Sequence, residues 1–231
     1  LGRRSDLFNV AIQSGAIVAV TLVYRARLWQ LTTQWHRDAA VRAVLFKMVT
    51  AFGVTAVLGL AAKTLGAELP ETVRPVAIAL IVGGFVIFAV EAWVKRQPVR
   101  EHISWSVAIA VGVAQILAGV FPGTSRSAAA IFAALLFGLT DRARAAEFAF
   151  IVGIPTMFAA TGYELLKTLG DAQARSAEPW LELGVAFAVS ALVGFATVKW
   201  LLRYIAGHSF VPFGWYRIAL GLALLVFLPA G

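Results

Sequence analysis

A short polar stretch inside an otherwise apolar part of the chain carries residue types that could bind an anion. Gly123, Thr124, Ser125, Arg126 and Ser127 follow a Phe-Pro pair and open a second apolar run. Hydroxyl groups, the free N–H groups of a helix N-terminus and the helix dipole all favour negative charge there. Glycine lets backbone amides approach a ligand closely, and a guanidinium matches phosphate oxygens in shape. The sequence therefore predicts a phosphate site.

We assign catalytic roles in this site to Arg126, Ser125 and Ser127, and substrate binding to Gly123, Thr124 and Gln115. An arginine at membrane depth costs at least about 2.5–3.5 kcal/mol on insertion scales, so it needs a partner or a watery cavity. Plainer interpretations remain open. The two serines could only cap a helix, the arginine could pair with a buried carboxylate, and the glutamine could hold helices together.

The remaining polar residues do not suggest a metal site within residues 1–231. Glu91 stands at the end of an apolar run beside Lys95 and is interpreted as an interfacial residue. The three histidines fall in loops, and no two of them have the spacing of metal ligands; they are His36, His102 and His208. The chain has no cysteine. The absence of cysteine excludes disulfides and thiolate chemistry.

The elements that must position these residues are membrane helices. The chain is 60% hydrophobic and 14% charged, with mean hydropathy +0.83. Soluble domains are about 45–50% apolar and about 25% charged, so a soluble domain is excluded. The net charge of +8 lies mainly in short loops beside apolar runs, as the positive-inside rule requires. We therefore predict an all-α polytopic membrane bundle, a single domain over residues 1–231, and no nucleic-acid partner.

Apolar runs predict six membrane spans and one interrupted segment. A basic loop, 25–42, separates the first two spans; the spans are about 8–24, 43–62, 75–94, 145–167, 181–203 and 212–228. The segment 104–140 breaks at 121–127 into arms of about 15–17 residues, which reach about 25 Å and cannot cross a hydrocarbon core of about 30 Å. This pattern predicts a re-entrant hairpin between two sets of three spans, which is typical of an inverted repeat.

The stretch FPGTSRS at 121–127 resembles the second signature, PGxSRS, of the bacitracin-resistance type undecaprenyl-diphosphate phosphatases. FNVAIQSGAIVA at 8–19 and HSFVPFGWYRIALG at 208–221 are similar to the first span and the last loop and span of that family. The resemblance implies a bacterial inner-membrane enzyme that hydrolyses undecaprenyl diphosphate to undecaprenyl phosphate and inorganic phosphate, recycling the cell-wall lipid carrier. It also implies six spans with two re-entrant hairpins and a Mg²⁺ or Ca²⁺ cofactor. We expect the lipid tail to lie between spans, against apolar faces such as Phe132, Leu135 and Leu136.

Two departures from the family pattern affect these expectations. The family's Glu-rich N-terminal signature and its Ser-Ser/Thr-Gly-His run have no counterpart in residues 1–231. We expect an N-terminally truncated chain, with the acidic metal ligands and the nucleophile ahead of Leu1. The second signature usually continues Gly-Ala-Thr, whereas this chain has Ala128, Ala129 and Ala130, which removes a hydroxyl and a flexible glycine.

The expected partners are a polyprenyl diphosphate lipid, the membrane and a second copy of the chain in a homodimer. A different class of function remains open. Half-helices that point their N-termini at an anion also bind substrates in secondary transporters. A transporter or flippase of a phosphate-bearing lipid or small anion would use the same residues without an acidic metal site.

Overall fold

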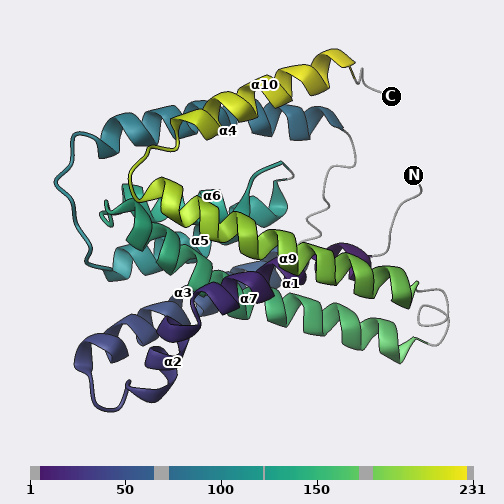
Figure 1. Cartoon of the computed structure of the whole chain (residues 1–231), viewed down its shortest axis with the longest axis horizontal. Coiled ribbons are helices and arrows are strands. Elements are labelled where there is room, and N and C mark those ends of the chain that lie inside the picture. Colours follow the sequence, from purple (N-terminus) through teal and green to yellow (C-terminus); the bar gives the residue numbers. More distant parts are fainter. Residues whose placement is uncertain (1–5, 65–72, 122, 172–178, 228–231) are drawn as a thin grey trace. The chain divides into compact units, whose positions relative to one another are not determined.

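The computed structural model describes residues 6–64, 73–121, 123–171 and 179–227 (Figure 1). Within these ranges all regular elements are helices, which confirms the all-α prediction. The helices are α1 (Asp6–Val23), α2 (Arg25–Thr33), α3 (Ala39–Thr64), α4 (Val73–Val94), α5 (Trp105–Val120), α6 (Arg126–Leu136), α7 (Arg142–Gly170), α9 (Trp180–Ile205) and α10 (Val211–Phe227).

The helices fall into two compact units, each of which combines segments from before and after the α5–α6 pair. Unit 1 comprises Leu1–Arg42 and Phe150–Arg203, and unit 2 comprises Ala43–Ala149 and Tyr204–Gly231. Unit 2 therefore contains α4, α5, α6 and α10, together with most of α3 and the start of α7. These elements carry the predicted site.

Within the described residues, four helices are long and apolar enough to cross a membrane, which confirms a polytopic protein. They are Ala39–Ala62, Arg74–Val94, Arg142–Gly170 and Trp180–Ile205. The first and last predicted spans coincide with shorter apolar helices, Ala11–Val23 and Val211–Phe227. The membrane boundaries, the re-entrant course of 104–140 and the single-domain assignment stay predictions.

The segment 25–42 is not entirely a loop as predicted, because α2 occupies Arg25–Thr33. The segment contains no glycine or proline, and its arginine, leucine, alanine and glutamine residues favour helix. Leu31 is buried, so one face of this short helix packs against the protein. The high charge of the segment indicated a loop, but charge alone does not prevent a helix that buries one side.

Two helices begin before the apolar runs that predicted them, and each is capped by an aspartate. The N–H groups of Ala40 and Val41 donate to Asp38 Oδ1 at 2.7 and 3.3 Å, at the start of α3. The N–H of Arg144 donates to Asp141 Oδ1 at 2.7 Å, at the start of α7. Because a side-chain acceptor satisfies the unpaired N–H groups of a first turn, each helix extends back to its aspartate.

Small and hydroxyl residues hold unit 1 together. The Ser190 hydroxyl of α9 donates to the Ile12 carbonyl of α1 at 2.6 Å, and the Ser14 and Thr161 hydroxyls of α1 and α7 are hydrogen-bonded. A Cβ on Gly15 would lie 2.5 Å from a backbone carbonyl oxygen of α9. Helices in apolar surroundings pack in this way, through small residues and interhelical hydrogen bonds.

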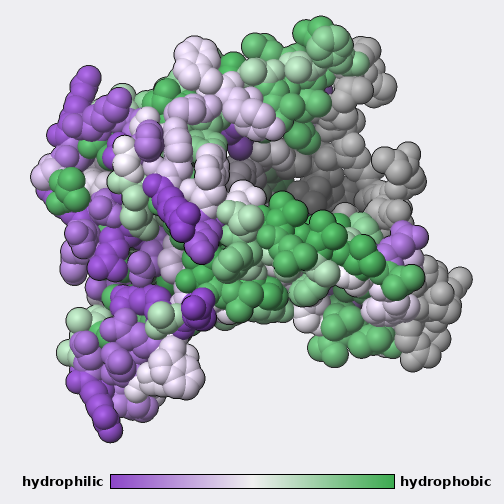
Figure 2. Space-filling model, in the orientation of Figure 1, coloured by the Kyte–Doolittle hydropathy of each residue, from purple (hydrophilic) through white to green (hydrophobic). Residues whose placement is uncertain are grey.

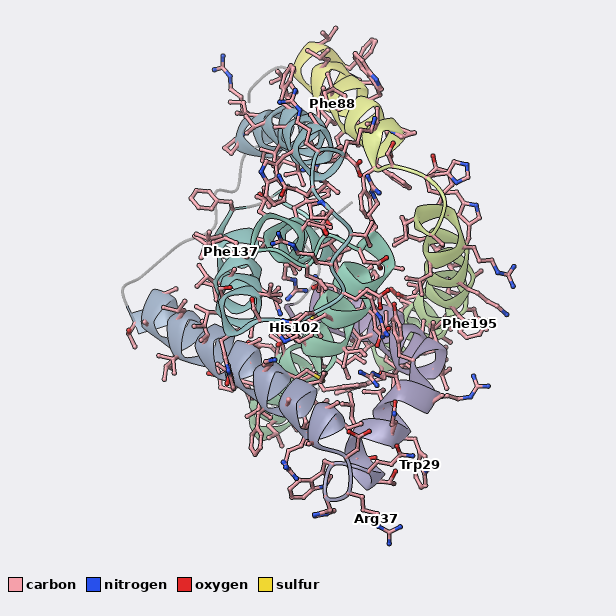
Figure 3. The ribbon with its side chains drawn as sticks, turned by 90° about the vertical axis from the view of Figure 1, so that its left-hand side faces the viewer. Trp29, Arg37, Phe88, His102, Phe137 and Phe195 are labelled. Carbon is pink, nitrogen blue, oxygen red and sulfur yellow. The ribbon has the colours of Figure 1, made fainter. Side chains whose placement is uncertain are left out.

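In unit 2, α4 and α10 lie side by side, and glycines allow their close approach (Figure 1). A Cβ on Gly84 of α4 would lie 2.8 Å from the Gly214 carbonyl oxygen of α10. A Cβ on Gly221 would lie 2.7 Å from the Ala77 carbonyl oxygen. Phe88 lies between the two helices (Figure 3) and occupies the space beside Gly214. The close spacing of α4 and α10 therefore depends on glycines, which have no side chain to hold the two helices apart.

A second helix pair supports the hairpin of unit 2. The Thr55 hydroxyl of α3 donates to the Gly112 carbonyl of α5 at 3.0 Å. A Cβ on Gly112 would lie 2.6 Å from the Ala51 carbonyl oxygen, so α3 and α5 are also in close contact. This packing holds the first arm of the hairpin against a long helix.

The surface of unit 2 separates charge from apolar area. Hydrophilic residues gather where α4 leads into α5, and hydrophobic residues cover much of α10 (Figure 2). Lys95, Arg96 and Arg100 are exposed in that loop, whereas Leu222 and Val226 are exposed on α10. Charged loops at the ends of lipid-facing helices produce this distribution.

Candidate active site

The predicted break at 121–127 forms a helix–turn–helix, with α5 and α6 packed against each other. Gly123 has φ +85°, a conformation that other residues rarely adopt, and a Cβ there would lie 2.7 Å from the Val76 carbonyl oxygen. The N–H of Thr124 donates to the Phe121 carbonyl at 3.2 Å, which closes the turn. Glycine thus provides both the turn and its close contact with the start of α4.

Ser125 caps the second helix of the hairpin. Its Oγ accepts from the N–H of Ala128 at 3.3 Å and lies 3.2 Å from Ser127 Oγ. The capping interpretation is therefore confirmed for Ser125. It does not exclude ligand binding, because the hydroxyl oxygen that accepts from the backbone can still donate its proton. Arg126 is the first residue of α6 and is half-buried.

The second arm of the hairpin is shorter than predicted, since α6 has 11 residues. Gly138, with φ +110°, ends it. The N–H of Leu139 donates to the Ala134 carbonyl at 3.0 Å and that of Gly138 to the Leu135 carbonyl at 3.2 Å, which is a Schellman motif. Composition did not reveal this stop, because the apolar run continues past the glycine.

A cavity of about 1040 Å³ lies between α4 and the hairpin. Most of its lining is apolar; its polar side chains are Thr124, Ser125 and Arg217, together with Ser106 at the start of α5. Phe132 and Leu136 line it as predicted for a lipid tail. Leu135, expected beside them, does not line the cavity, because it is 0% exposed and buried in the protein interior.

Arg217, on α10, is a site residue that the sequence reasoning missed. Its Nη2 donates to the Gly123 carbonyl at 2.9 Å and to the Ala79 carbonyl at 3.2 Å. Its Nε is buried and has no hydrogen-bond partner among the described residues. The signal was present in the sequence, because an arginine inside the apolar run 212–228 incurs the same insertion cost as Arg126.

The structure brings together five of the six predicted site residues. Gly123, Thr124, Ser125, Arg126 and Ser127 form the hairpin turn and the first residues of α6. Of their side chains, those of Thr124 and Ser125 line the cavity, and those of Arg126 and Ser127 do not. The catalytic and binding roles assigned to these residues stay predictions.

Gln115, the sixth predicted residue, is buried in α5 with 5% of its surface exposed. It does not line the cavity, and its Nε2 has no hydrogen-bond partner within the described part of the chain. Neither ligand binding nor a helix–helix hydrogen bond is visible for it, so both interpretations stay open.

The alanines that replace the usual Gly-Ala-Thr have two environments. Ala128 and Ala129 line the cavity, whereas Ala130 is buried in the hairpin and does not. A hydroxyl at position 130 would thus lie outside the cavity, and the alanine at 128 extends the apolar wall next to the polar turn.

Glu91, interpreted from the sequence as an interfacial residue, is buried within the protein, with its side chain only 1% exposed; its depth in the membrane stays a prediction. Arg142 Nε and Nη2 donate to its two carboxylate oxygens at 3.0 and 2.6 Å, and the N–H of Phe210 donates to Oε1 at 2.9 Å. This carboxylate joins the end of α4 to the starts of α7 and α10. The sequence could not show the pairing, because the partners lie far apart along the chain.

The described residues near the turn do not fit a divalent cation. No group of three or more His, Asp or Glu side chains in the described ranges could hold a metal ion. The side chains beside the cavity are hydroxyls and a guanidinium, whereas Mg²⁺ and Ca²⁺ favour carboxylate oxygens. We therefore assign no catalytic step to a metal ion held by these residues.

Comparison with known proteins identifies the family. The family model described as "Bacitracin resistance protein BacA" matches residues 2–223. The chain is 54% identical over 228 residues to an undecaprenyl-diphosphatase of Xylella fastidiosa (strain 9a5c), covering 99% of this chain and 87% of that protein. It is 55% identical over 225 residues to one of Rhizobium johnstonii, covering 97% and 84%. These matches extend over nearly the whole chain, so the chain belongs to the BacA family of bacitracin resistance proteins.

Proposed function

We propose that this multi-pass protein of the bacterial inner membrane hydrolyses undecaprenyl diphosphate to undecaprenyl phosphate and inorganic phosphate. The observation that carries the proposal is a cavity of about 1040 Å³ that is apolar along most of its wall and polar where the hairpin turn meets Arg217. Such a cavity suits a ligand with an anionic head and a hydrocarbon tail. Relatives named undecaprenyl-diphosphatase, at 54–55% identity, support the same substrate.

The residues of the turn would bind and activate the diphosphate. Phosphoryl transfer depends mainly on positioning and on charge stabilisation, because there is little covalent work for the protein. Arg126 would neutralise charge that develops on the transferred phosphoryl group. The hydroxyls of Ser125 and Ser127 would donate to its oxygens, and the Thr124 hydroxyl and the backbone at Gly123 would bind the rest of the diphosphate.

Arg217 would supply a second positive charge beside the turn, where it contacts the Gly123 carbonyl. Its Nε–H is a buried donor without a hydrogen-bond partner in the described residues, and the side chain lines the cavity. A buried donor without an acceptor costs about 1–3 kcal/mol, and a phosphate oxygen would remove that cost. The two guanidiniums would then contact the diphosphate from α6 and from α10.

The hydrocarbon tail would lie along the apolar wall that leads away from the turn. Phe132 and Leu136 of α6 and Val82 and Val86 of α4 form part of this wall. Burial of hydrocarbon contributes about 25 cal/mol per Å², so the tail would add affinity without directing the chemistry. Gln115, buried in α5 outside the cavity lining, stays a predicted substrate contact.

Other expected partners remain proposals. The BacA resemblance implies Mg²⁺ or Ca²⁺, and chelation followed by titration of each ion into an activity assay tests that expectation. The homodimer and the absence of a nucleic-acid partner are likewise expectations. The mass of the detergent-solubilised protein by light scattering, with and without added DNA, tests both.

Release of inorganic phosphate from undecaprenyl diphosphate is the direct test of the proposed function. The purified protein in proteoliposomes, with Mg²⁺, should release phosphate in proportion to protein added. A second set of vesicles measures movement of a labelled polyprenyl phosphate between leaflets. Movement of the lipid without phosphate release would contradict the hydrolase and support a flippase.

Replacing Arg217 by alanine should lower kcat/KM for undecaprenyl diphosphate by about 100-fold, the usual effect of removing one donor that stabilises transition-state charge. The change also removes the hydrogen bonds to Gly123 and Ala79, so the thermal midpoint should be measured alongside the rate. An unchanged kcat/KM in a folded variant would place Arg217 outside the reaction.

A further inference from the structure

We propose that Gly83 of α4 is a positioning residue: the missing side chain at this position makes the notch in which the Arg217 guanidinium lies. The inference rests on the proposed function in one respect, namely that Arg217 contacts the diphosphate. The notch would determine where that guanidinium meets the substrate, without Gly83 touching the substrate.

The guanidinium of Arg217 lies close to α4 at Gly83. A Cβ built on this glycine would be 2.5 Å from Nη2, 2.9 Å from Nε and 3.0 Å from Cζ of Arg217. Those three atoms are also the nearest to the added carbon. Heavy atoms do not approach so closely without repulsion, so any side chain at position 83 would displace the guanidinium.

The same notch exposes a hydrogen-bond acceptor to Arg217. In an α-helix the N–H of residue 83 donates to the carbonyl of residue 79, and that oxygen has a second lone pair. Because Gly83 has no side chain, Arg217 Nη2 reaches the Ala79 oxygen at 3.2 Å. The same Nη2 donates to the Gly123 oxygen at 2.9 Å, so the guanidinium bridges α4 and the hairpin turn.

Displacing the backbone of α10 to relieve a clash at position 83 would disrupt its close packing against α4. Gly214 and Gly221, about one turn before and after Arg217, bring α10 into close contact with α4. A methyl group on Gly83 must therefore be accommodated by movement of the arginine side chain, which is long and flexible. The fold should tolerate the change, whereas the position of the guanidinium should not.

The neighbouring glycine has a different environment and provides a contrast. A Cβ on Gly84 would lie 2.8 Å from the Gly214 carbonyl oxygen and 2.5 Å from an Ile218 side-chain carbon. Gly84 therefore sets the spacing between the helices, and its replacement should affect stability. Replacing Gly83 therefore tests the contact with Arg217, and replacing Gly84 tests the packing of α4 against α10.

Replacing Gly83 by alanine should lower kcat/KM for undecaprenyl diphosphate by about 10- to 100-fold, because a misplacement of about 1 Å costs up to about 10²-fold. The thermal midpoint should stay close to that of the parent protein. The matched control is Gly53→Ala on α3, where nothing lies within 4 Å of the added Cβ and the rate should not change. A Gly83→Ala protein that keeps the parent rate, or that fails to fold, would overturn the inference.

The decisive measurement is a double-mutant cycle that combines Gly83→Ala with Arg217→Ala. Both the Kd for undecaprenyl diphosphate and the rate of phosphate release are measured for each variant. If Gly83 acts through Arg217, Gly83→Ala weakens binding in the parent protein and has no further effect in the Arg217→Ala protein. Equal effects in both backgrounds would overturn the inference. Failure of the proposed function is distinguishable, because the parent protein would then bind the lipid without releasing phosphate.

Discussion

Replacing Arg126 by alanine is expected to lower the rate of phosphate release from undecaprenyl diphosphate by about 10³- to 10⁵-fold, the range for removing an arginine that stabilises a transferred phosphoryl group. The side chain stands at the first residue of α6, beside the hydroxyls of Ser125 and Ser127. Its charge adds to that of the helix N-terminus, so the substrate phosphate would lose its strongest interaction in the transition state.

Arg126→Lys should recover part of the loss, because lysine keeps the charge but lacks the planar fork that binds two phosphate oxygens at once. The matched control is Arg37→Ala, which removes an exposed arginine that does not line the cavity. Rates should be measured at saturating substrate, with the thermal midpoint checked for each variant. Near-parent turnover in a folded Arg126→Ala protein would remove this residue from the reaction.

Replacing Arg142 by alanine is expected to destabilise the protein by about 3 kcal/mol, at the lower end of the range for breaking a buried ion pair. The Glu91 carboxylate, which is 1% exposed in the intact protein, would keep the N–H of Phe210 as a donor but lose its charged partner. Arg142 itself is 25% exposed, so water can reach part of the site and limits the cost. The change should appear as a lower midpoint of thermal unfolding in detergent.

A second arginine, two residues along, provides the control. Arg144 forms ion pairs with Glu101 and Glu147 at 3.4 and 3.5 Å, and it is largely exposed. Its replacement by alanine should cost at most about 1 kcal/mol. Adding Glu91→Gln to Arg142→Ala should restore part of the stability, because a neutral amide is less costly to bury than an unpaired carboxylate. Equal effects of the two arginine replacements would show that burial of Glu91 contributes little.

The local structure of the hairpin followed from the sequence because its determinants are neighbours along the chain. Glycine at 123 permits a turn with positive φ, and a serine at 125 caps the helix that begins at the next residue. The same kind of signal existed for the second arm, where Gly138 stops α6. Hydropathy concealed that stop, since it records how apolar a segment is and not where its backbone turns.

Local patterns also account for the errors at helix boundaries. The helix α2 lies in a segment whose charge indicated a loop, and Leu31 shows that burial of one face was enough to form it. Asp38 and Asp141 cap their helices before the apolar runs begin. In each case hydropathy marked the apolar part of the helix, whereas hydrogen bonds decided where the helix started.

By itself, the sequence determined that this protein is a bundle of membrane helices, and it located the turn at Gly123–Ser125 that separates α5 from α6. Composition and helix-end signals act within a few residues, so one chain segment is enough to read them. Only the tertiary structure decided that Arg217 meets Gly123 and that Glu91 pairs with Arg142. The position of Arg217 depends on how closely α4 and α10 approach, which is set by glycines more than a hundred residues apart, such as Gly84 and Gly214. No local pattern records such a distance, because it results from the packing of two complete helices.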